Sequence, residues 1–272
     1  MPELPEVETI IRGLAPRLSG QKISLINLRL PSLLKGAKEG DLKKLQGKRI
    51  ISLRRRGKII IIDCEGGISL LFHLKMTGNL LLVDRKFEVD KHTHLIITFD
   101  NKPKELRFRD IRKFGSFYLL PTSRIFSLNP LNKLGPEALE IGLNEFLFMV
   151  KNRQARIKNL LLNQSFIAGL GNIYTNEILF QAKIHPLRPA SQLKAKEIKR
   201  LWTVMRKVLV KAVESKGSSV RNYRDANGRQ GRFQDYHQVY GRQAQPCPRC
   251  GQKIERIHQG GRSTFFCSRC QK

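Results

Sequence analysis

The first three residues of the chain, Met1-Pro2-Glu3, carry its strongest chemical signal. Removal of an initiator methionine would leave the secondary amine of Pro2 as the terminus, with the carboxylate of Glu3 beside it. An α-amine titrates near pH 8, about two units below a lysine amine, so more of it is unprotonated and nucleophilic at neutral pH. A secondary amine that attacks an aldehyde-like carbon forms an iminium, the Schiff-base chemistry usually assigned to lysine. The terminal proline is therefore a candidate covalent nucleophile.

Four of the five cysteines lie in the last 26 residues and form two CxxC pairs separated by 16 residues. They are Cys247, Cys250, Cys267 and Cys270. Two such pairs match the four-thiolate zinc pattern, and a reducing cytosol disfavours disulfides. We expect one structural zinc ion, closed by four thiolates without an open position for water. Cys64 lies in an apolar strand pattern and is expected to be a small buried residue.

A helix is expected to hold the terminal proline. Pro5 suits the first helical position and Glu6 the first turn. The apolar residues that follow at helical spacing are Val7, Ile10, Ile11, Leu14 and Leu18. A helix start is also the purely structural interpretation of these residues. Both interpretations can hold together, because a nucleophile is best placed on a rigid element.

Short apolar runs separated by turn residues follow this helix and predict strands. The runs are 50–53, 59–63, 68–74, 79–83, 94–99, 105–109 and 116–120. Their regular spacing favours a β-sandwich or barrel. Helical spacing begins at Asn144 and predicts one or two helices over 146–162, a helix over 172–182 and a long amphipathic helix around 198–212. A zinc hairpin, with strands near 252–258 and 262–266, is expected to end the chain.

The fold class is therefore α+β with two domains. We expect an N-terminal catalytic domain over 1–125, a linker over 126–136, a helical domain over 137–235 that contains a polar basic loop at 216–234, and the zinc finger over 236–272. A long loop in a compact protein is usually functional or disordered.

The net charge of +29, from 51 basic and 22 acidic residues, indicates a polyanionic partner. The basic residues are spread along the chain, which suits a protein that wraps around a nucleic-acid duplex. A membrane surface is a weaker candidate because no helix pairs a wide apolar face with a continuous basic one. The sequence has no apolar run near 18 residues, and its acidic start is no signal peptide. We expect a soluble cytoplasmic protein.

Several motifs occur together in one order. They are Pro2-Glu3-Leu4-Pro5-Glu6-Val7-Glu8, Arg55-Arg56-Gly57-Lys58, His73-Leu74-Lys75-Met76-Thr77-Gly78, Lys91-His92-Thr93-His94, Asp110-Ile111-Arg112-Lys113-Phe114-Gly115, Gly169-Leu170-Gly171-Asn172-Ile173-Tyr174, Val239-Tyr240-Gly241-Arg242, and Gly261-Arg262-Ser263-Thr264-Phe265-Phe266-Cys267 between the zinc pairs. Across essentially the whole chain, this set resembles the bacterial formamidopyrimidine-DNA glycosylases.

The resemblance implies a bifunctional base-excision repair enzyme. Such enzymes act on double-stranded DNA, remove oxidised purines (8-oxoguanine opposite cytosine, and formamidopyrimidines), and then cut the strand at the abasic site by β,δ-elimination. The resemblance also implies a β-sandwich domain with flanking helices, a helix-two-turn-helix domain and a zinc-finger hairpin.

The same resemblance implies roles for single residues. Pro2 would be the nucleophile, Glu3 the general acid or base, Lys58 the residue for β-elimination and Arg262 the residue for δ-elimination. Glu6 would support the amine or the flipped base, or serve only as a helix-cap charge. The implied DNA-contacting residues are His73, His92, Arg112, Arg153 and Asn172, and Met76, Arg112 and Phe114 would fill the space left by an extruded base. The loop 216–234 would close over that base.

Two features depart from the family pattern. Lys113 stands where the family commonly has a second arginine, and Thr93 replaces an acidic residue between the two histidines.

Two other functions stay open as alternatives. An endonuclease VIII-like glycosylase for oxidised pyrimidines typically begins Pro-Glu-Gly-Pro-Glu and lacks the Met/Arg/Phe set. A non-catalytic zinc-ribbon DNA-binding protein would explain the charge and the cysteines alone.

Overall fold

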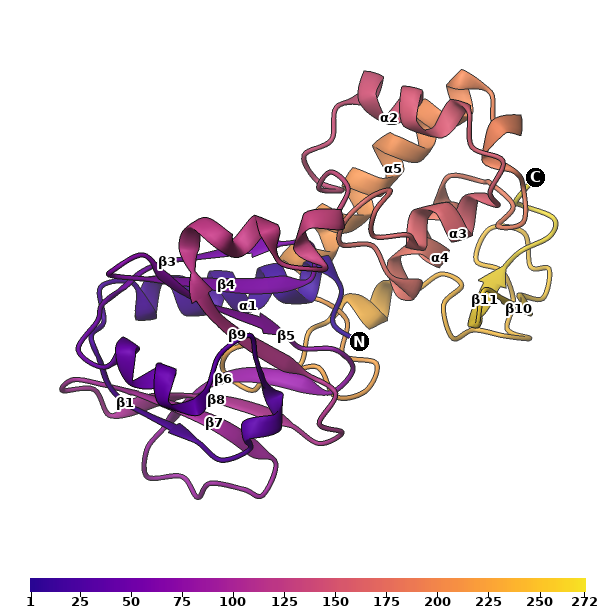
Figure 1. Ribbon diagram of the computed structural model, residues 1–272. Helices are drawn as coiled ribbons and strands as arrows, with labels where there is room; N and C mark the ends of the chain where they lie inside the picture. The colour runs from indigo at the N-terminus through magenta and orange to yellow at the C-terminus, as the bar shows by residue number, and fades with distance from the viewer. The chain divides into compact units, whose positions relative to one another are not determined.

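The computed structural model describes residues 1–272, which form two compact units. Unit 1 comprises Met1–Asn132 and Ser215–Arg232, and unit 2 comprises Lys133–Glu214 and Phe233–Lys272. Each unit is thus built from two separate stretches of chain, visible in the colours of Figure 1. The loop 216–234 was predicted as part of the helical domain, whereas most of it packs within unit 1. Tyr223 and Ala226 belong to the hydrophobic core of that unit.

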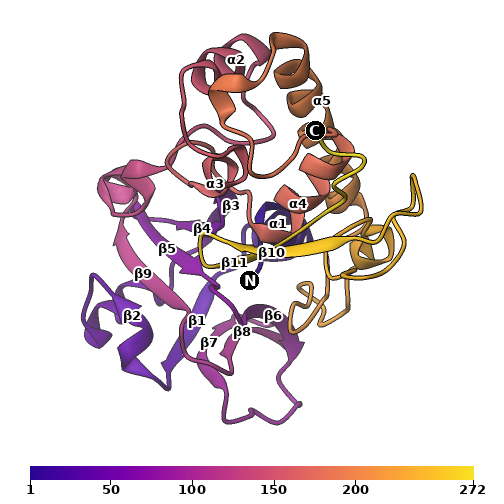
Figure 2. The ribbon, with the colours of Figure 1, turned by 90° about the vertical axis from the view of Figure 1, so that its right-hand side faces the viewer.

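Unit 1 is a sandwich of two sheets (Figures 1 and 2). The four-stranded sheet has the order β1-β7-β8-β6, with β1 (Ile23–Leu28), β7 (Thr93–Phe99), β8 (Lys104–Asp110) and β6 (Gly78–Asp84). The five-stranded sheet has the order β2-β9-β5-β4-β3, with β2 (Leu34–Lys35), β9 (Ser116–Pro121), β5 (Ile68–His73), β4 (Ile59–Cys64) and β3 (Ile50–Arg56). All neighbouring strands are antiparallel except β2 and β9. Apolar side chains from both inner faces form the core, including the ring cluster of Phe72, Phe108 and Phe117.

Seven strands that the apolar runs predicted are confirmed, with ends shifted by no more than three residues. The strands β1 and β2 were not among the predicted runs. In β1 the apolar side chain of Leu25 is 52% exposed. The segment Ile23–Leu28 therefore lacks the regular alternation of buried apolar and exposed polar residues that predicts a strand. The connections of unit 1 also contain short 3₁₀ helices at Pro31–Leu33, Glu39–Leu45 and Thr122–Ser127.

Helix α1 (Leu4–Leu18) covers part of unit 1 and contacts β3. Proline occupies its first turn, and the carboxylate of Glu6 accepts the backbone N–H of Glu3 at 2.8 Å in a capping box. Glu8 on the same helix accepts a hydrogen bond from Arg55 of β3 at 3.1 Å. The predicted apolar stripe is buried along the whole helix, so the first residues of the chain are held on a rigid element.

Two turns of unit 1 come together because of the strand pairing. One joins β5 to β6 over residues 74–77, and the other joins β8 to β9 over residues 111–115. His73 at the end of β5 pairs with Ser116 at the start of β9, while Gly78 at the start of β6 pairs with Asp110 at the end of β8. Both turns therefore cross from one sheet to the other at the same corner of the sandwich.

Unit 2 contains four α-helices. They are α2 (Leu143–Lys151), α3 (Ile157–Leu162), α4 (Asn172–Gln181) and α5 (Ala195–Glu214). The predicted helical segment 146–162 is thus two helices, and the two later helices are confirmed. Short 3₁₀ helices lie at Ala190–Gln192 and Phe233–Tyr236, and another, Leu131–Lys133, lies where the chain passes from unit 1 to unit 2. α5 contacts both α2 and α4. No helix of the structure is both long and apolar enough to cross a membrane.

The chain ends in a two-stranded hairpin of β10 (Glu255–Gln259) and β11 (Arg262–Phe266). Gly260 and Gly261 form its turn with φ of 56° and 71°. Two consecutive positive φ values define the tight turn that hairpins prefer, and glycine adopts them without a steric penalty. The hairpin lies against α4 (Figure 2).

Candidate active site and nucleic-acid interface

The start of the chain is a buried site in unit 1. Pro2, Glu3 and Glu6 are all buried. One carboxylate oxygen of Glu6 accepts the N–H of Glu3, and the other accepts the N–H of Ser218 at 2.7 Å. Glu6 therefore joins the start of α1 to the loop 215–232. It does more than cap the helix, because its second oxygen fixes a loop more than 200 residues away in sequence.

The electrostatic surroundings of the terminal amine suit a nucleophile. Burial is the largest cause of a lowered pKa for the α-amino group of Met1. The positive charges of Lys58 and Arg221 lower this pKa further, and the carboxylates of Glu3 and Glu6 oppose the shift. The structure thus brings Glu3 and Lys58 into electrostatic reach of the amine. A lowered pKa raises the unprotonated fraction at neutral pH, which is the form that can attack carbon.

Lys58 lies in the tight turn between β3 and β4, and its side chain is only 8% exposed. The turn is built by Gly57 with φ of 55°, and Arg55 donates to the carbonyl oxygen of Gly57 at 3.0 Å. This burial argues against the simple alternative of a solvated basic turn. A lysine is rarely buried to this degree without a partner or a task.

Met76, Arg112 and Phe114, here called the wedge residues, lie together on the two corner turns. The guanidinium of Arg112 is 4.6 Å from the centre of the Phe114 ring, and its Nη1 is 3.4 Å from the sulfur of Met76. All three side chains are exposed: Met76 is 42% and Phe114 is 54% accessible. A sulfur, a cation and an aromatic ring thus form one projecting group, although 36 residues separate Met76 from Arg112.

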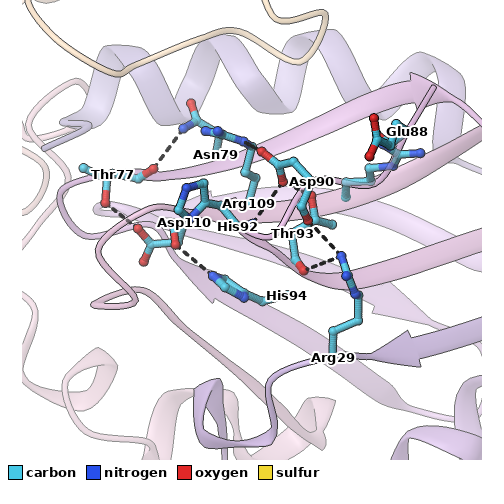
Figure 3. Close-up of polar contacts among 11 residues, drawn as sticks. Arg29, Thr77, Asn79, Glu88, Asp90, His92, Thr93, His94, Arg109 and Asp110 are labelled. Atoms are coloured by element: carbon cyan, nitrogen blue, oxygen red, sulfur yellow. Dashed lines mark hydrogen bonds and ion pairs between the residues drawn. The ribbon is translucent and has the colours of Figure 1, made fainter.

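His73 and His92 differ in their surroundings. Burial, followed by the charges of Lys75 and Lys58, lowers the pKa of His73 to about 3. Its Nδ1 accepts the backbone N–H of Lys75 at 3.1 Å, so the neutral ring carries its proton on Nε2. His73 can therefore serve as a neutral hydrogen-bond donor and not as a cation. His92 is half-buried, in a turn that the Asp90 carboxylate holds by accepting the His92 N–H at 3.2 Å (Figure 3).

The surrounding hydrogen bonds explain why a threonine, and not an acidic residue, occupies position 93. Its hydroxyl donates to the Asp90 carboxylate at 2.8 Å, and Arg29 donates to the carbonyl oxygens of Asp90 and Thr93 at 2.9 and 3.2 Å (Figure 3). Asp90 also accepts a hydrogen bond from Arg109. A threonine hydroxyl donates to this carboxylate, where an acidic residue would repel it.

Unit 2 carries Arg153, Asn172 and Arg262. Asn172 begins α4, directly after Gly171, and its side-chain amide donates to the carbonyl oxygen of Ser263 at 2.9 Å. This bond ties the start of the helix to the hairpin residue that follows the exposed Arg262. Arg153 is exposed in the connection between α2 and α3. The structure thus joins Asn172 and Arg262 in one rigid group.

The hairpin is also fixed by residues that the sequence analysis did not identify. Lys158 of α3 is fully buried, and its ammonium donates to the carbonyl oxygen of Ser263 at 3.1 Å and to the Thr264 hydroxyl at 2.6 Å. Asn176 accepts the N–H of Phe265 at 2.8 Å. Their signals in the sequence were an ordinary basic run and an ordinary helix, so only the tertiary structure shows that they hold the hairpin.

The four cysteines fit a zinc ion. Their sulfur atoms all lie within 4.8 Å of one another. The Cys247–Cys270 and Cys250–Cys267 sulfur pairs are 3.9 and 3.5 Å apart. A tetrahedral site with Zn–S bonds of about 2.3 Å requires sulfur separations of about 3.8 Å. All four positions are thiolates, so the ion would be structural and would hold the base of the β10–β11 hairpin.

Together, a sandwich with a buried terminal amine and a helical unit with a thiolate zinc hairpin have the architecture of the zinc-containing helix-two-turn-helix DNA glycosylases. Family models bear this out along the chain. Residues 1–117 match the formamidopyrimidine-DNA glycosylase N-terminal domain, residues 134–224 match the formamidopyrimidine-DNA glycosylase H2TH domain, and residues 244–272 match a zinc finger found in FPG and IleRS.

Relatives and solved structures agree with these matches. The formamidopyrimidine-DNA glycosylases of Pelotomaculum thermopropionicum and Streptococcus pyogenes serotype M18 are 42% and 43% identical, over 100% of this chain and 99% of each relative. A Lactococcus lactis FPG variant in complex with a Fapy-dG containing DNA superposes with a TM-score of 0.93 at 38% identity, covering 100% of both chains. The Lactococcus lactis Fpg in complex with an abasic site containing DNA gives 0.92 at 38% identity, covering 99% of both chains. The chain belongs to the formamidopyrimidine-DNA glycosylase family, and its resemblance, its fold class and its structural zinc are confirmed.

Proposed function

We propose that this protein is a base-excision repair DNA glycosylase with lyase activity, which removes oxidised purines from double-stranded DNA and then cuts the strand at the abasic site. The observation that carries the proposal is the terminal amine directly before the buried residues Pro2 and Glu3, with Glu3 and Lys58 in electrostatic reach. Family membership supports it, and so does the net charge of +29, which suits a DNA partner.

The family resemblance assigns each step of the reaction to a single residue. The amine of Pro2 attacks C1′ of the damaged nucleotide, and Glu3 supplies a proton as the sugar ring opens and the base departs. The iminium formed on Pro2 acidifies the neighbouring C2′–H, so that elimination breaks the bond to the 3′ oxygen. We assign this β-elimination to Lys58 and the later δ-elimination to Arg262. Zinc supplies no chemistry and holds the hairpin that carries Arg262.

The wedge residues provide access to the base. An enzyme that acts on a purine nucleotide must take it out of the stack, and apolar side chains commonly fill the space that remains. Met76 and Phe114 supply these apolar groups, while Arg112 supplies donors for the base left without its partner. His73, His92, Arg153 and Asn172 would contact the DNA backbone, and most of the loop 216–234 would cover the extruded base.

Oxidised pyrimidines are the alternative substrate class. One solved relative, the wild-type Lactococcus lactis Fpg, was crystallised with an oxidized pyrimidine containing DNA. Leu4 and the complete wedge set nevertheless favour purines here. A non-catalytic DNA-binding protein would have no need for a buried terminal amine beside Glu3 and Lys58. We place the enzyme in the bacterial cytosol or nucleoid, where its substrate lies, and expect it to act as a monomer.

Incision assays test the proposed function directly. Duplexes that contain 8-oxoguanine opposite cytosine, a formamidopyrimidine, an oxidised pyrimidine or an abasic site would be incubated with the full chain. We expect cleavage at the two purine lesions and at the abasic site, with phosphate left on both new ends. Faster cleavage at the pyrimidine lesion would favour the alternative substrate class, and no cleavage of any duplex would refute an enzymatic role.

Arg112→Ala should reduce the preference for cytosine opposite the lesion. Its guanidinium can donate to the acceptor edge of an orphaned cytosine, and such contacts are worth about 1–3 kcal/mol of discrimination. We therefore expect a loss of about tenfold or more in the cytosine-over-adenine preference. The measurement is binding to abasic-analogue duplexes with each opposite base, across a salt series.

Three other polar residues serve as controls for this prediction. Lys58→Ala should weaken binding to every duplex and make the salt dependence shallower by about one counterion. Asn172→Ala should also weaken every duplex, without a change in salt dependence. Lys113→Gln, next to Arg112 in the exposed turn, should leave the opposite-base preference intact. An Arg112→Ala variant that bound all duplexes equally weakly would contradict the assigned role.

A further inference from the structure

The two corner turns that carry the wedge residues are linked by a pair of buried polar side chains. Asp110 is fully buried and Thr77 is 8% exposed. The Thr77 hydroxyl donates to Oδ1 of Asp110 (Figure 3), and the backbone N–H of Arg112 is shared between these two oxygens, at 3.2 Å from each. Thr77 directly follows Met76, so this contact connects the first turn to the second.

The Asp110 carboxylate also fixes the other end of the second turn. Its Oδ2 accepts the backbone N–H of Gly115 at 2.7 Å. A Cβ at Gly115 would lie 2.7 Å from the ring of Phe108 and 3.0 Å from Oδ2, so the close approach requires glycine. One carboxylate thus binds the N–H groups of Arg112 and Gly115, on either side of Phe114. These two hydrogen bonds fix the backbone on both sides of Phe114, and with it the positions of Arg112 and Phe114.

Two neighbouring side chains bond the backbone of Thr77 and Asp110. Nε2 of the buried His94 bonds the carbonyl oxygen of Asp110 at 2.8 Å, and the amide of Asn79 donates to the carbonyl oxygen of Thr77 at 2.9 Å (Figure 3). Both bonds reach the backbone at the bases of the two turns. Of the two histidines of this motif, His94 contacts the network through its side chain, whereas His92, predicted as a DNA contact, meets it through its backbone carbonyl, which accepts the N–H of Asp110 at 2.9 Å.

The backbone of both turns needs such a constraint. Lys75 and Lys113 have φ of 50° and 57°, in the left-handed region that side-chain-bearing residues rarely adopt. Each lies directly before an apolar wedge residue, Met76 or Phe114. Conformations of this kind persist where the surroundings over-determine them, and they concentrate at functional positions.

We propose that Thr77 and Asp110 are positioning residues that hold the wedge residues in the arrangement needed to read the base opposite the lesion. This inference rests on the proposed function. Without the Thr77 hydroxyl, Met76 and Arg112 are no longer held by a common group, so the guanidinium loses its fixed position. Neither Thr77 nor Asp110 contacts DNA in this role, and both act through the wedge.

Thr77→Val tests the proposal, because it removes the hydroxyl and keeps the shape of the side chain. We expect the preference for cytosine over adenine opposite 8-oxoguanine to fall about tenfold, approaching that of Arg112→Ala, because the Arg112 guanidinium is no longer held at the orphaned base. Thr77→Ser keeps the hydroxyl and should restore most of the preference. A duplex with 2-aminopurine next to an abasic analogue reports wedge insertion by its fluorescence, and we expect a smaller signal for Thr77→Val.

Ser69→Ala is the matched control for stability. The buried Ser69 hydroxyl donates to the Asp63 carboxylate at 2.7 Å in the same unit, on strands that carry no wedge residue. The Ser69→Ala substitution should lower the thermal unfolding temperature without changing the opposite-base preference. If Thr77→Val does not fold, Thr77→Ala removes the same hydroxyl and gives the same comparison.

Two outcomes would overturn the inference. One is a Thr77→Val variant that loses stability as Ser69→Ala does but keeps the wild-type preference and the wild-type 2-aminopurine signal. The other is a Thr77→Ser variant as impaired as Thr77→Val, because the hydroxyl would then not matter. Failure of the proposed function is separate: the wild-type chain would cut no lesion duplex, while the 2-aminopurine signal would still report the effect of Thr77 on insertion.

Discussion

Borohydride added during the reaction with lesion DNA is expected to trap a covalent protein–DNA adduct whose linkage maps to Pro2. Reduction of the iminium fixes the bond between the proline nitrogen and C1′ of the sugar. Pro2→Gly keeps a terminal amine and should retain part of the lyase activity and of the trapping. A chain whose terminus is acetylated, or extended by residues that are not removed, should give no adduct, because its terminal nitrogen is not nucleophilic or is displaced from the site.

The matched control is Pro5→Ala, which alters the other proline of the same motif. Pro5 lies in the first turn of α1 and has no free nitrogen, so its replacement should leave trapping intact. The pH dependence adds a second check. Burial, together with the charges of Lys58 and Arg221, lowers the pKa of the Met1 amine in the structure. The same surroundings would act on the Pro2 amine once Met1 is removed, so trapping should reach its plateau at a lower pH than an exposed prolyl amine would require. Full activity from an acetylated terminus would refute Pro2 as the nucleophile.

Removal of zinc should abolish DNA binding while unit 1 stays folded. Cys250→Ser takes away one of the four thiolates, and zinc binding in such modules supplies about 10–16 kcal/mol of their folding free energy. The β10–β11 hairpin would lose its fixed base, and with it the position of Arg262. We expect at least a hundredfold loss of affinity for lesion duplexes, roughly what losing several ordered phosphate contacts costs. Metal content, binding and the thermal unfolding of unit 1 would be measured on the same preparations.

Cys64→Ala provides the control for the zinc prediction. Cys64 is a buried thiol of β4 outside the metal cluster. Its replacement removes a cysteine from the chain, yet one zinc ion per chain and normal DNA binding should remain. Metal-free protein that bound and cut lesion DNA normally would show that the hairpin needs no metal.

Local patterns in the sequence account for what could be predicted. The zinc ligands lie in two short motifs whose spacing sets their geometry, so the sequence alone identifies all four. Seven strands followed from apolar runs between turn residues, because both the runs and the turns are local signals. The strand β1 was missed because its exposed Leu25 blurs the alternation.

Contacts between distant segments account for what could not be predicted. Asp110 belongs to one of the sequence motifs that carry the family resemblance, but its contact with the first corner turn depends on Thr77, which lies 33 residues earlier. Likewise, nothing near Glu6 in the sequence indicates Ser218 as a partner. The assignment of the loop 216–234 to the helical domain followed chain order, whereas the packing of Tyr223 and Ala226 follows the core of the sandwich.

Because unit 1 is built from two separate segments of the chain, no single break in the chain separates the two units. Tyr223 and Ala226 complete the core, Ala226 accepts the N–H of Leu82 on β6 at 2.9 Å, and Ser218 binds Glu6 beside the amine. A fragment that ends at residue 132 would lack all three, and one that starts at residue 133 would carry them without their partners. The chain passes from one unit to the other at three points along its length, after residues 132, 214 and 232. A gene fusion that joined the sandwich of one relative to the helices of another would therefore have to exchange the segment Ser215–Arg232 together with the sandwich.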